Sequence, residues 1–367
     1  MKILQLLPEL HSGGVERGTL ELGRYLVEQG HPSVVVSNGG RLVAQLEAEG
    51  SRHVTFPVHR KSPASLLQVR PLREFLRAEK PDILHARSRV PAWLAFLAWR
   101  RMAPATRPKF VTTVHGFNSV SPYSRIMTRG ERVICVSHSI HDFVRRKYPG
   151  CPEERLAVIP RGIDPTEYPR EFQPSPEWLE DWYGEFPETR GKRLLVLPGR
   201  ITRLKGHHDF LRLIKDLAPH HPDVHGVVAG GAPPTKQAYL HEIERTIEEM
   251  GLGDRITLTG LRAGLREILA ISSIACSLTQ QPESFGRTTL ESLALGTPVI
   301  GYDYGGVGEI LAALLPAGAV PPGDHAALVE RSARFLAAPP AIARENPFSL
   351  ARMLTDTVAL YEALLKA

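Results

Sequence analysis

The sequence predicts an α/β protein with two doubly wound parallel-sheet domains, and three observations lead to this fold class. The chain has 367 residues, and because a domain commonly holds about 100–200 residues, the length fits two domains. Hydrophobic residues make up 43% and charged residues 23% of the chain, a composition that excludes an intrinsically disordered protein. Short apolar segments alternate with amphipathic segments, which is the βαβα order of a parallel sheet covered by helices.

The first half contains short segments that are apolar on both faces, as the strands of a buried parallel sheet are. We predict strands at Ile3–Leu7, Val34–Ser37, His53–Phe56, Ile83–Ala86, Val111–Val114, Val133–Val136 and Ala157–Ile159. Amphipathic segments between them, such as Thr19–Gln29 and Leu66–Glu79, predict helices.

A stretch rich in Pro, Glu and Trp separates the two halves. Five prolines fall between Asp164 and Gly191, and because proline removes a backbone donor and breaks regular elements, no long element is expected there. We therefore predict an N-terminal domain over 1–165, an interdomain connection over 166–191 and a C-terminal domain over 192–347.

The βα order restarts after this stretch. Strands are predicted at Leu194–Leu197, Val224–Ala229, Ile256–Leu258, Ser273–Leu278 and Val299–Tyr302, with helices at Gly206–Leu217 and Lys236–Met250. Residues 348–367 have apolar positions at helical spacing, which predicts a terminal helix that packs back on the N-terminal domain. Ligands of doubly wound sheets bind at the carboxyl ends of the strands, so we expect the two domains to face one cleft.

The cysteines and the apolar segments indicate a cytoplasmic protein. Cys135, Cys151 and Cys276 form no C-x-x-C pair and no metal-ligand spacing, which argues against a disulfide scaffold or a zinc module. The apolar segment after Lys2 stops at Pro8 and does not resemble a signal peptide. No apolar segment approaches the ~20 residues that span a bilayer.

The net charge of +6 conceals a basic first half and an acidic second half. Residues 1–150 carry 23 Lys and Arg against 11 Asp and Glu, whereas residues 151–367 carry 22 against 28. A basic half attracts nucleic acid, an anionic membrane surface or an acidic substrate, or it is simply a solvated surface. Because no aromatic and basic recognition motif of the usual kinds is present, we do not expect a nucleic acid partner.

The first candidate motif is the segment from Ser12 to Gly18, directly after the first predicted strand. The paired glycines Gly13 and Gly14 let backbone N–H groups approach an oxyanion, and the following helix offers its positive N-terminus. The segment is not G-x-G-x-x-G, which weakens a dinucleotide interpretation, and a simple strand-to-helix turn remains an alternative.

The second motif, Pro198-Gly199-Arg200-Ile201-Thr202-Arg203-Leu204-Lys205-Gly206, again lies between a strand and a helix. Arg200 and Lys205 place two cations at the edge of the sheet where the strands have their carboxyl ends. Two such cations suit a diphosphate. In a surface turn the same two residues would have no function, and the position at the carboxyl end of a strand favours the functional interpretation.

The third motif places two glutamates eight positions apart, Glu283 in a loop and Glu291 about one turn inside a helix that follows Gly286. The helix N-terminus and nearby amides suit phosphate oxygens or sugar hydroxyls. Glu291 would accept from the two vicinal hydroxyls of a ribose, and Glu283 from hydroxyls of a second sugar. A capped amphipathic helix with incidental acids is the alternative.

Together these motifs resemble the retaining GT-B glycosyltransferases of family 4 (glycosyltransferase group 1), including those of the lipopolysaccharide-core type, over nearly the whole chain. The resemblance also includes Gly296-Thr297-Pro298-Val299-Ile300 and the segment Val158-Ile159-Pro160-Arg161-Gly162-Ile163-Asp164. In the latter segment the family usually has Asn where this chain has Arg161.

The resemblance implies a set of site residues. The implied donor-binding residues are Gly13, Gly14, Arg200, Lys205, Arg262, Glu283, Phe285, Gly286, Arg287, Thr288 and Glu291. Among them, Arg200 and Lys205 would bind the diphosphate, Glu291 the ribose and Arg262 the nucleobase. His115, Arg200, Lys205 and Glu283 would form the catalytic group, with His115 facing the donor sugar and phosphate.

The implied function is the transfer of a hexose or N-acetylhexosamine from a nucleoside-diphosphate sugar, UDP-linked, to a glycan or lipid-linked acceptor in cell-envelope polysaccharide or lipopolysaccharide synthesis. Retention in this family is usually explained by front-face attack in which the leaving phosphate deprotonates the acceptor, so no general base is nominated. Because the chain has no Asp-x-Asp sequence, we expect no metal and no other cofactor. A nucleotide-sugar epimerase of the same fold, or a non-catalytic nucleotide-sugar-binding partner, is the alternative.

The acceptor is expected on the N-terminal domain. Pro91–Met102 combines Trp93, Phe96 and Trp99 with the adjacent Arg100-Arg101. This segment is either the buried face of an ordinary helix or a surface helix that lies on an anionic bilayer. The second interpretation would place the protein at the inner face of the cytoplasmic membrane, in peripheral contact through its basic domain.

Overall fold

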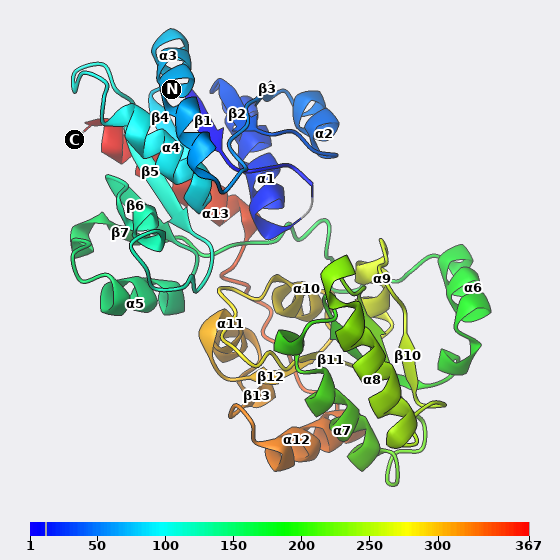
Figure 1. The fold of residues 1–367 in the computed structure, drawn as a ribbon. Helices are drawn as coiled ribbons and strands as arrows, with labels where there is room; N and C mark the ends of the chain where they lie inside the picture. The colour runs from blue at the N-terminus through cyan, green and yellow to red at the C-terminus, as the bar shows by residue number, and fades with distance from the viewer. Residues whose placement is uncertain (12, 367) are drawn as a thin grey trace. The chain divides into compact units, whose positions relative to one another are not determined.

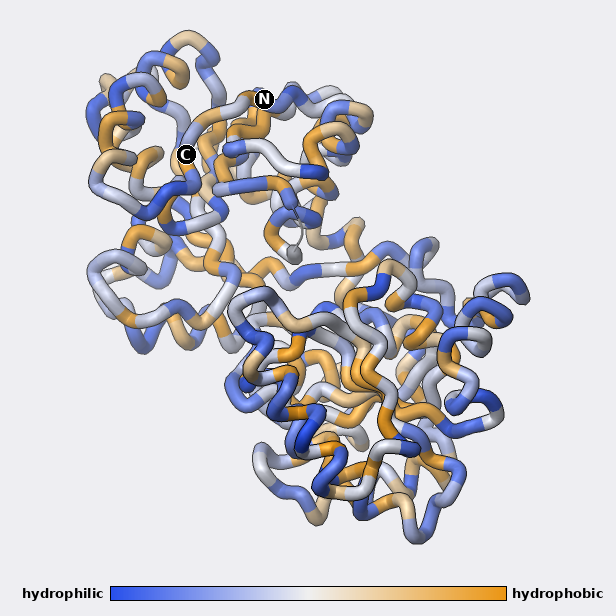
Figure 2. The backbone as a smooth tube through the Cα atoms, turned by 45° about the vertical axis from the view of Figure 1, so that its right-hand side comes forward, coloured by the Kyte–Doolittle hydropathy of each residue, from blue (hydrophilic) through white to orange (hydrophobic). Residues whose placement is uncertain are grey.

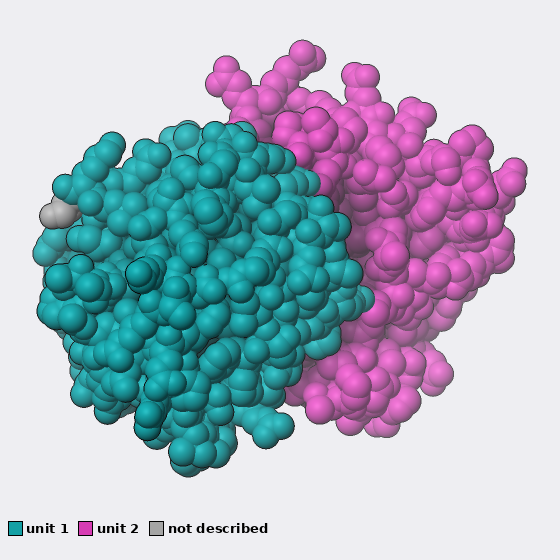
Figure 3. All heavy atoms as spheres, turned by 90° about the horizontal axis from the view of Figure 1, so that it is seen from above, with its two compact units in different colours: residues 1–161, 350–367 teal, residues 162–349 magenta. Residues whose placement is uncertain are grey.

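The computed structural model describes residues 1–11 and 13–366, and the chain forms two compact units (Figure 3). Unit 1 comprises residues 1–161 together with the C-terminal segment from residue 350, and unit 2 comprises residues 162–349. The chain therefore leaves unit 1 once, builds unit 2 and returns. The chain changes units four residues before the predicted boundary at residue 165.

Unit 1 is built on a seven-stranded parallel sheet with the strand order β3-β2-β1-β4-β5-β6-β7 (Figure 1). Its strands are β1 (Ile3–Leu6), β2 (Ser33–Ser37), β3 (Arg52–Thr55), β4 (Ile83–Ala86), β5 (Lys109–Val114), β6 (Arg132–Cys135) and β7 (Leu156–Val158). All seven predicted strands are confirmed, with ends shifted by one or two residues. The order reverses between β1 and β4, so this pair forms the switch point at which doubly wound sheets bind ligands.

Helices cover both faces of this sheet, because alternate strand residues point to opposite sides. The helices of unit 1 are α1 (Gly14–Glu28), α2 (Val43–Ala48), α3 (Val69–Glu79), α4 (Arg89–Trp99), α5 (His138–Lys147) and α13 (Leu350–Lys366). Ile3 and Ile83 pack with α1 and α13, whereas Leu4 and Leu84 pack with α3 and α4. In Figure 2 the hydrophobic parts of the backbone, coloured orange, lie mainly inside each unit.

The predicted C-terminal helix corresponds to α13, and its final residue, Ala367, lies outside the described residues. Leu350, Leu354 and Leu364 of α13 are buried against the unit 1 sheet. The Tyr361 hydroxyl is 2.6 Å from His85 Nδ1 on β4. The last helix therefore supplies part of the core of the first unit.

Unit 2 repeats the arrangement with six parallel strands in the order β10-β9-β8-β11-β12-β13. Its strands are β8 (Arg193–Pro198), β9 (Val224–Ala229), β10 (Ile256–Leu258), β11 (Ile274–Ser277), β12 (Val299–Tyr302) and β13 (Ala319–Val320). Its helices are α6 (Pro176–Glu185), α7 (His207–Leu217), α8 (Gln237–Glu249), α9 (Leu265–Ala270), α10 (Arg287–Leu295), α11 (Gly305–Leu314) and α12 (His325–Ala337). The five predicted strands are present, and the short β13 was not predicted.

The structure corrects the predicted interdomain connection over 166–191, because this segment belongs to unit 2 and contains the helix α6. Ser175 caps the helix by accepting from the Trp178 N–H at 3.2 Å, and Pro176 occupies its first turn, where the missing donor costs nothing. The Trp182 ring is buried in the unit 2 core, stacked on Trp178 with a centroid distance of 5.4 Å. Pro176, one of the prolines that predicted a break here, starts a helix instead.

The structure also decides between the two interpretations of the aromatic segment 91–102. In α4 the Trp99 ring is buried, and its N–H donates to the Pro108 carbonyl at 2.7 Å. The Trp93 N–H donates to the Tyr123 carbonyl at 2.9 Å, and Phe96 packs against the same core. These aromatic side chains therefore form the buried side of an ordinary helix, and the surface-helix interpretation is wrong.

Candidate active site

The candidate site of unit 2 lies at its switch point, between the carboxyl ends of the neighbouring strands β8 and β11. Lys205 ends the short 3₁₀ turn Arg203–Lys205 after β8, and Glu283 lies in the loop after β11. The Lys205 ammonium donates to Glu283 Oε1, although 78 positions separate the two residues. Their side chains are 28% and 21% exposed, so the pair is partly shielded and still accessible to a ligand.

Glycine positions shape the loop that carries Lys205. The backbone of Gly206 is left-handed, with φ of +75°, and a Cβ there would lie 1.9 Å from the Leu278 carbonyl oxygen. A Cβ at Gly199 would lie 3.1 Å from Lys205 Cε. Only glycine at these two positions lets the loop approach β11 and lets the lysine stem lie on the backbone.

The loop that carries Glu283 rests on the start of α11. The Gly306 N–H donates to the Glu283 carbonyl at 2.8 Å, and a Cβ at Gly305 would lie 2.5 Å from the same oxygen. The Phe285 side chain is buried and meets the Phe348 ring edge-on, at a centroid distance of 5.7 Å. Phe285 therefore anchors the loop through its side chain, and its backbone is the part left to act in a site.

The third motif forms the N-terminus of α10. Gly286 precedes the helix in a left-handed conformation with φ of +97°, followed by Arg287 and Thr288 in the first turn. Glu291 lies one turn further and is only 6% exposed, with Oε1 3.5 Å from Arg287 Nε. A buried carboxylate beside a guanidinium and a helix N-terminus can accept hydrogen bonds from neutral hydroxyls.

The two arginines predicted for this unit differ in their surroundings. The Arg200 side chain is exposed and forms no polar contact with the described residues. Arg262, after β10, forms a bidentate pair with Glu185 of α6 and lies over the Phe186 ring, 4.9 Å from its centroid. The Arg262 Nε also donates to the Thr259 carbonyl at 2.9 Å. Glu185 was missed by the sequence analysis because α6 was missed.

The candidate residues of unit 1 also lie at the carboxyl ends of strands. Gly13 and Gly14 follow β1 at the switch point, while Ser12 lies outside the described residues. His115 follows β5, and Arg161 follows β7. Arg161 NH1 donates to the Gly14 carbonyl at 2.6 Å, and its NH2 donates to His115 Nδ1 at 2.8 Å. Arg161 thus connects the glycine loop with the histidine.

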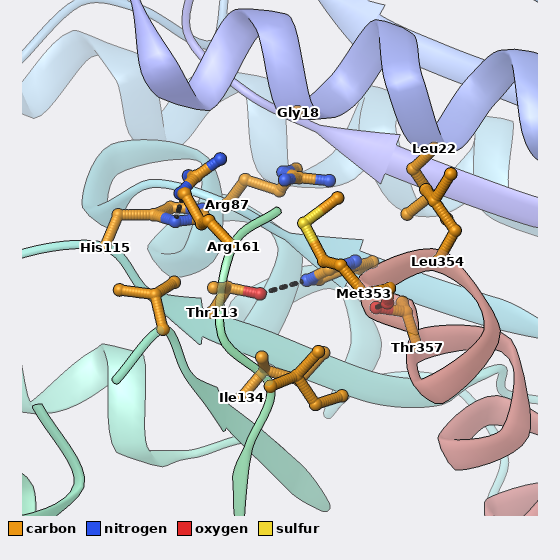
Figure 4. A pocket seen from close by; sticks show the side chains of 13 residues that line it. Gly18, Leu22, Arg87, Thr113, His115, Ile134, Arg161, Met353, Leu354 and Thr357 are labelled. Atoms are coloured by element: carbon orange, nitrogen blue, oxygen red, sulfur yellow. Dashed lines mark hydrogen bonds between the residues drawn. The ribbon is translucent and has the colours of Figure 1, made fainter. Parts of the chain in front are cut away.

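The His115 and Arg161 side chains line a small cavity of about 30 Å³ beside α1 and α13 (Figure 4). Its polar wall includes Arg87, which follows β4, and Thr113 of β5. Arg87 NH1 donates to Gln5 Oε1 at 2.7 Å. Burial, together with the nearby guanidiniums of Arg161 and Arg87, holds the pKa of His115 well below its usual range. His115 is therefore a neutral imidazole near pH 7.

Neither Arg87 nor Arg161 was predicted as a site residue. A signal existed for both, because each arginine directly follows a predicted strand or its adjoining turn at the ligand-binding edge of the sheet. Their contacts with residues 46 to 147 positions away could not be predicted from local sequence.

Among the described residues, no cluster of three or more His, Cys, Asp and Glu side chains is arranged to hold a metal ion. Within the same part of the chain, no helix combines the length and the hydrophobicity that crossing a bilayer requires.

Comparison with known families agrees with the fold. Residues 12–167 match the family described as Glycosyltransferase Family 4, and residues 180–347 match Glycosyl transferases group 1. The chain therefore belongs to the GT-B glycosyltransferases of family 4, group 1, and is a glycosyltransferase, as the motifs predicted.

Individual relatives are more distant. The chain is 25% identical over 323 residues to N-acetyl-alpha-D-glucosaminyl L-malate synthase of Bacillus anthracis. The aligned region covers 83% of this chain and 79% of the relative. It is 28% identical over 233 residues to the lipopolysaccharide core biosynthesis mannosyltransferase LpsB of Rhizobium meliloti, covering 57% and 61%.

Among solved structures, a glycosyltransferase from Rickettsia africae superposes with a TM-score of 0.87 at 28% identity, covering 100% of this chain and 98% of that one. Anabaena Alr3699/HepE, solved in complex with UDP and glucose, superposes with a TM-score of 0.74 at 20% identity, covering 100% and 95%. The second similarity concerns the fold alone.

Proposed function

We propose that this glycosyltransferase moves a hexose or N-acetylhexosamine, with retention, from a UDP-linked sugar to a glycan or lipid-linked acceptor of the cell envelope. The observation that carries the proposal is the Lys205–Glu283 pair at the switch point of unit 2. A cation and a carboxylate side by side match the two parts of such a donor, a diphosphate and a sugar rich in hydroxyls.

The proposed chemistry follows from the charges that develop when the donor bond breaks. Negative charge grows on the leaving diphosphate, and Lys205 together with the exposed Arg200 stabilises it. Glu283 accepts from hydroxyls of the transferred sugar, and the buried Glu291 accepts from the ribose. Arg262 lies beside the nucleobase, and the amides from Gly286 to Thr288 contact the donor. On unit 1, the Gly13-Gly14 loop and His115 contact donor oxygens.

The proposal assigns no general base and no metal. The leaving phosphate takes the proton of the acceptor hydroxyl, and the two cations take the role that a metal has in other transferases. If the proposal is correct, adding a chelator leaves the turnover unchanged, and loss of turnover that Mg²⁺ or Mn²⁺ restores would contradict the metal-free part.

The acceptor class rests on two features. One relative is named as a lipopolysaccharide core mannosyltransferase, and the first 150 residues are strongly basic, which suits a phosphorylated or lipid-linked acceptor at the inner face of the membrane. Another relative is named as an N-acetyl-alpha-D-glucosaminyl L-malate synthase, and L-malate is a small anion. The proposal takes the glycan or lipid-linked form.

A thermal-shift screen against UDP, GDP and ADP sugars tests the donor class. We expect one class, the UDP sugars, to raise the unfolding temperature selectively, because a ligand that binds only the folded state stabilises it. Incubation with that donor and candidate acceptors, followed by mass spectrometry, then identifies the product.

The same incubation separates the alternatives. An epimerase would convert the donor without any acceptor, and a binding protein would be stabilised without turnover. Equal stabilisation by all three nucleotide classes, or by none, would contradict the proposed donor. Variants of Glu283 and Glu291 that keep binding and turnover would remove the sugar and ribose assignments.

A further inference from the structure

We propose that Arg161 is a positioning residue that holds His115 as the neutral tautomer with its proton on Nε2. In this form the histidine is a hydrogen-bond donor to an oxygen of the bound substrate, and it is not a general base. The inference rests on the proposed function in that it takes His115 to contact the donor sugar or phosphate. The assignment of the tautomer itself needs only the contacts within unit 1.

The contact between the two side chains determines which ring nitrogen carries the proton. Arg161 NH2 is 2.8 Å from His115 Nδ1 (Figure 4). A guanidinium has five N–H donors and no acceptor, so the nitrogen that faces it must accept. A neutral imidazole with an accepting Nδ1 carries its proton on Nε2.

Arg161 is well suited to enforce this state because it is itself fixed. The residue is only 6% exposed, and its NH1 donates to the Gly14 carbonyl at 2.6 Å. Gly18 of α1 makes room for the guanidinium, since a Cβ there would lie 2.6 Å from Arg161 NH1 and 3.1 Å from Arg87 NH2. Any side chain at position 18 would therefore push the guanidinium away from the histidine.

The groups around His115 disfavour the doubly protonated ring. The guanidiniums of Arg161 and Arg87 both face it and would repel an imidazolium, and His85, whose own pKa burial holds well below its usual range, lies beside them. The Nε2 atom is buried and has no hydrogen-bond partner among the described residues. A buried donor without a partner lowers the free energy of unfolding. We therefore expect the Nε2–H to donate a hydrogen bond to an oxygen of the bound ligand.

This protonation state limits what His115 can do in the reaction. The Nδ1 lone pair of His115 is taken by Arg161, and Nε2 already holds its proton, so neither nitrogen can receive the proton of the acceptor hydroxyl. His115 can contribute one fixed N–H to a sugar hydroxyl or a phosphate oxygen. This restricts its ligand to a hydrogen-bond acceptor.

Nitrogen-15 NMR of the full chain, labelled at histidine, tests the tautomer directly. The chain has 15 histidines, and comparison with His115→Gln identifies the signal of interest. At pH 7.5 we expect wild-type His115 to show a protonated Nε2 and an unprotonated Nδ1. A protonated Nδ1, or an even mixture of tautomers, would overturn the inference without any variant of Arg161.

Variants then test the role of Arg161. Arg161→Met removes the donors and should leave His115 as a mixture of tautomers, whereas Arg161→Lys, which also only donates, should restore the Nε2–H form. Thr113→Val is the matched control, because Thr113 Oγ1 lies in the same cavity but contacts His85 Nε2 at 2.6 Å. An unchanged His115 signal in Arg161→Met would overturn the role of Arg161.

Turnover measurements separate this inference from the proposed function. By analogy with partners that orient metal-bound histidines, Arg161→Met should lower kcat about 10- to 100-fold, with most activity regained in Arg161→Lys. If wild-type protein shows the Nε2–H tautomer and Arg161→Met loses it, but no nucleotide sugar is turned over, the positioning role stands and the proposed function fails. If turnover is normal in Arg161→Met despite a changed tautomer, the inference fails and the proposed function stands.

Discussion

At the scale of single residues, the Lys205–Glu283 contact shows how two loops supply complementary charges to one place. Neither side chain is deeply buried, so the attraction between them is screened by water and contributes little to folding. A partly exposed pair of this kind can separate when a ligand offers a phosphate to the cation and hydroxyls to the carboxylate. The pair is therefore better suited to meeting a ligand than to stabilising the fold.

Replacement of Lys205 by alanine tests this view. We expect Lys205→Ala to keep the fold and to lose about 100-fold or more in kcat, because removal of one charge-assisted contact in a closed site costs about 2.7–4 kcal/mol of transition-state stabilisation. Steady-state kinetics and donor titration measure the effect. Lys215→Ala, an exposed lysine on α7, is the control. Wild-type turnover with unchanged donor affinity in Lys205→Ala would remove the diphosphate assignment.

His207, the first residue of α7, makes unit 2 sensitive to acid. Its side chain is 1% exposed, and burial lowers its pKa from 6.5 to about 4. Between pH 6.5 and pH 4 this histidine is protonated in the unfolded chain and neutral in the folded chain. It therefore leaves the free energy of unfolding unchanged above pH 6.5 and lowers it as the pH falls toward 4. The loss reaches about 1.4 kcal/mol for each pH unit in this window.

The variant His207→Phe keeps a ring against Tyr239, which the histidine meets edge-on at 5.8 Å between centroids. Thermal unfolding at pH 7.5 and pH 5 should show a smaller decrease in melting temperature for the variant than for the wild-type protein. Equal decreases would mean that His207 does not carry the acid sensitivity, because the other buried histidines are common to both proteins.

Sequence patterns predicted Arg200, Lys205 and Glu283 after strand ends and Glu291 in the helix that follows, because a strand followed by glycine and a helix is a local signal. The contact between Lys205 and Glu283 was not predictable in the same way. It depends on β8 and β11 being neighbours, which the order of strands in the sheet decides. Arg161 was likewise visible as a residue, whereas its histidine partner was not.

At the scale of elements, the turn between β8 and α7 depends on Gly206. Alanine there meets two penalties, a left-handed backbone and a Cβ 1.9 Å from a carbonyl oxygen. Gly251 is also left-handed, with φ of +69°, but a Cβ there would meet nothing within 4 Å. Comparing alanine substitutions at the two glycines therefore distinguishes the effect of backbone strain from that of steric overlap.

We expect Gly251→Ala to cost about 1–2 kcal/mol of unfolding free energy, from the backbone alone. Gly206→Ala should cost a further 1–3 kcal/mol or so, because the overlap forces the loop to move. The displaced loop should also weaken donor binding, which Gly251→Ala should leave intact. Thermal unfolding and donor titration measure both effects, and equal destabilisation by the two variants would contradict the steric argument.

Two elements illustrate why sequence prediction of the fold was incomplete. The strands were predictable, because their residues are apolar on both faces. The helix α6 was not, because Pro176 was interpreted as a break, although proline suits the first turn of a helix. The aromatic segment of α4 fitted the buried face of a helix or a membrane surface, and the contacts of Trp93 and Trp99 distinguish the two.

At the scale of the whole molecule, both units have the same strand order, three strands on one side of the switch point and the rest on the other. Each unit therefore offers one ligand-binding edge of its own. The charge differs between them, since the excess of basic residues lies within the first 150 positions. Because the aromatic side chains of α4 pack into the core, the membrane proposal now rests on this diffuse charge.

Co-sedimentation with anionic vesicles tests the remaining membrane proposal. At low salt we expect the protein to bind anionic vesicles and not neutral ones, and the bound fraction should fall steeply as salt is added, because no apolar face is inserted. Absence of binding at low salt would remove the membrane proposal. Binding that persists at high salt would contradict a purely electrostatic contact.

The position of α13 has a consequence for biosynthesis. The ribosome makes the seven strands of unit 1 first, then about 190 residues of unit 2, and only afterwards the helix that covers Ile3 and Ile83. At about 5–20 residues per second, the nascent unit 1 stays without this cover for about 10 to 40 s. During this interval the nascent chain exposes the part of the sheet face that α13 later covers, and chaperones that bind apolar surfaces have that time in which to act.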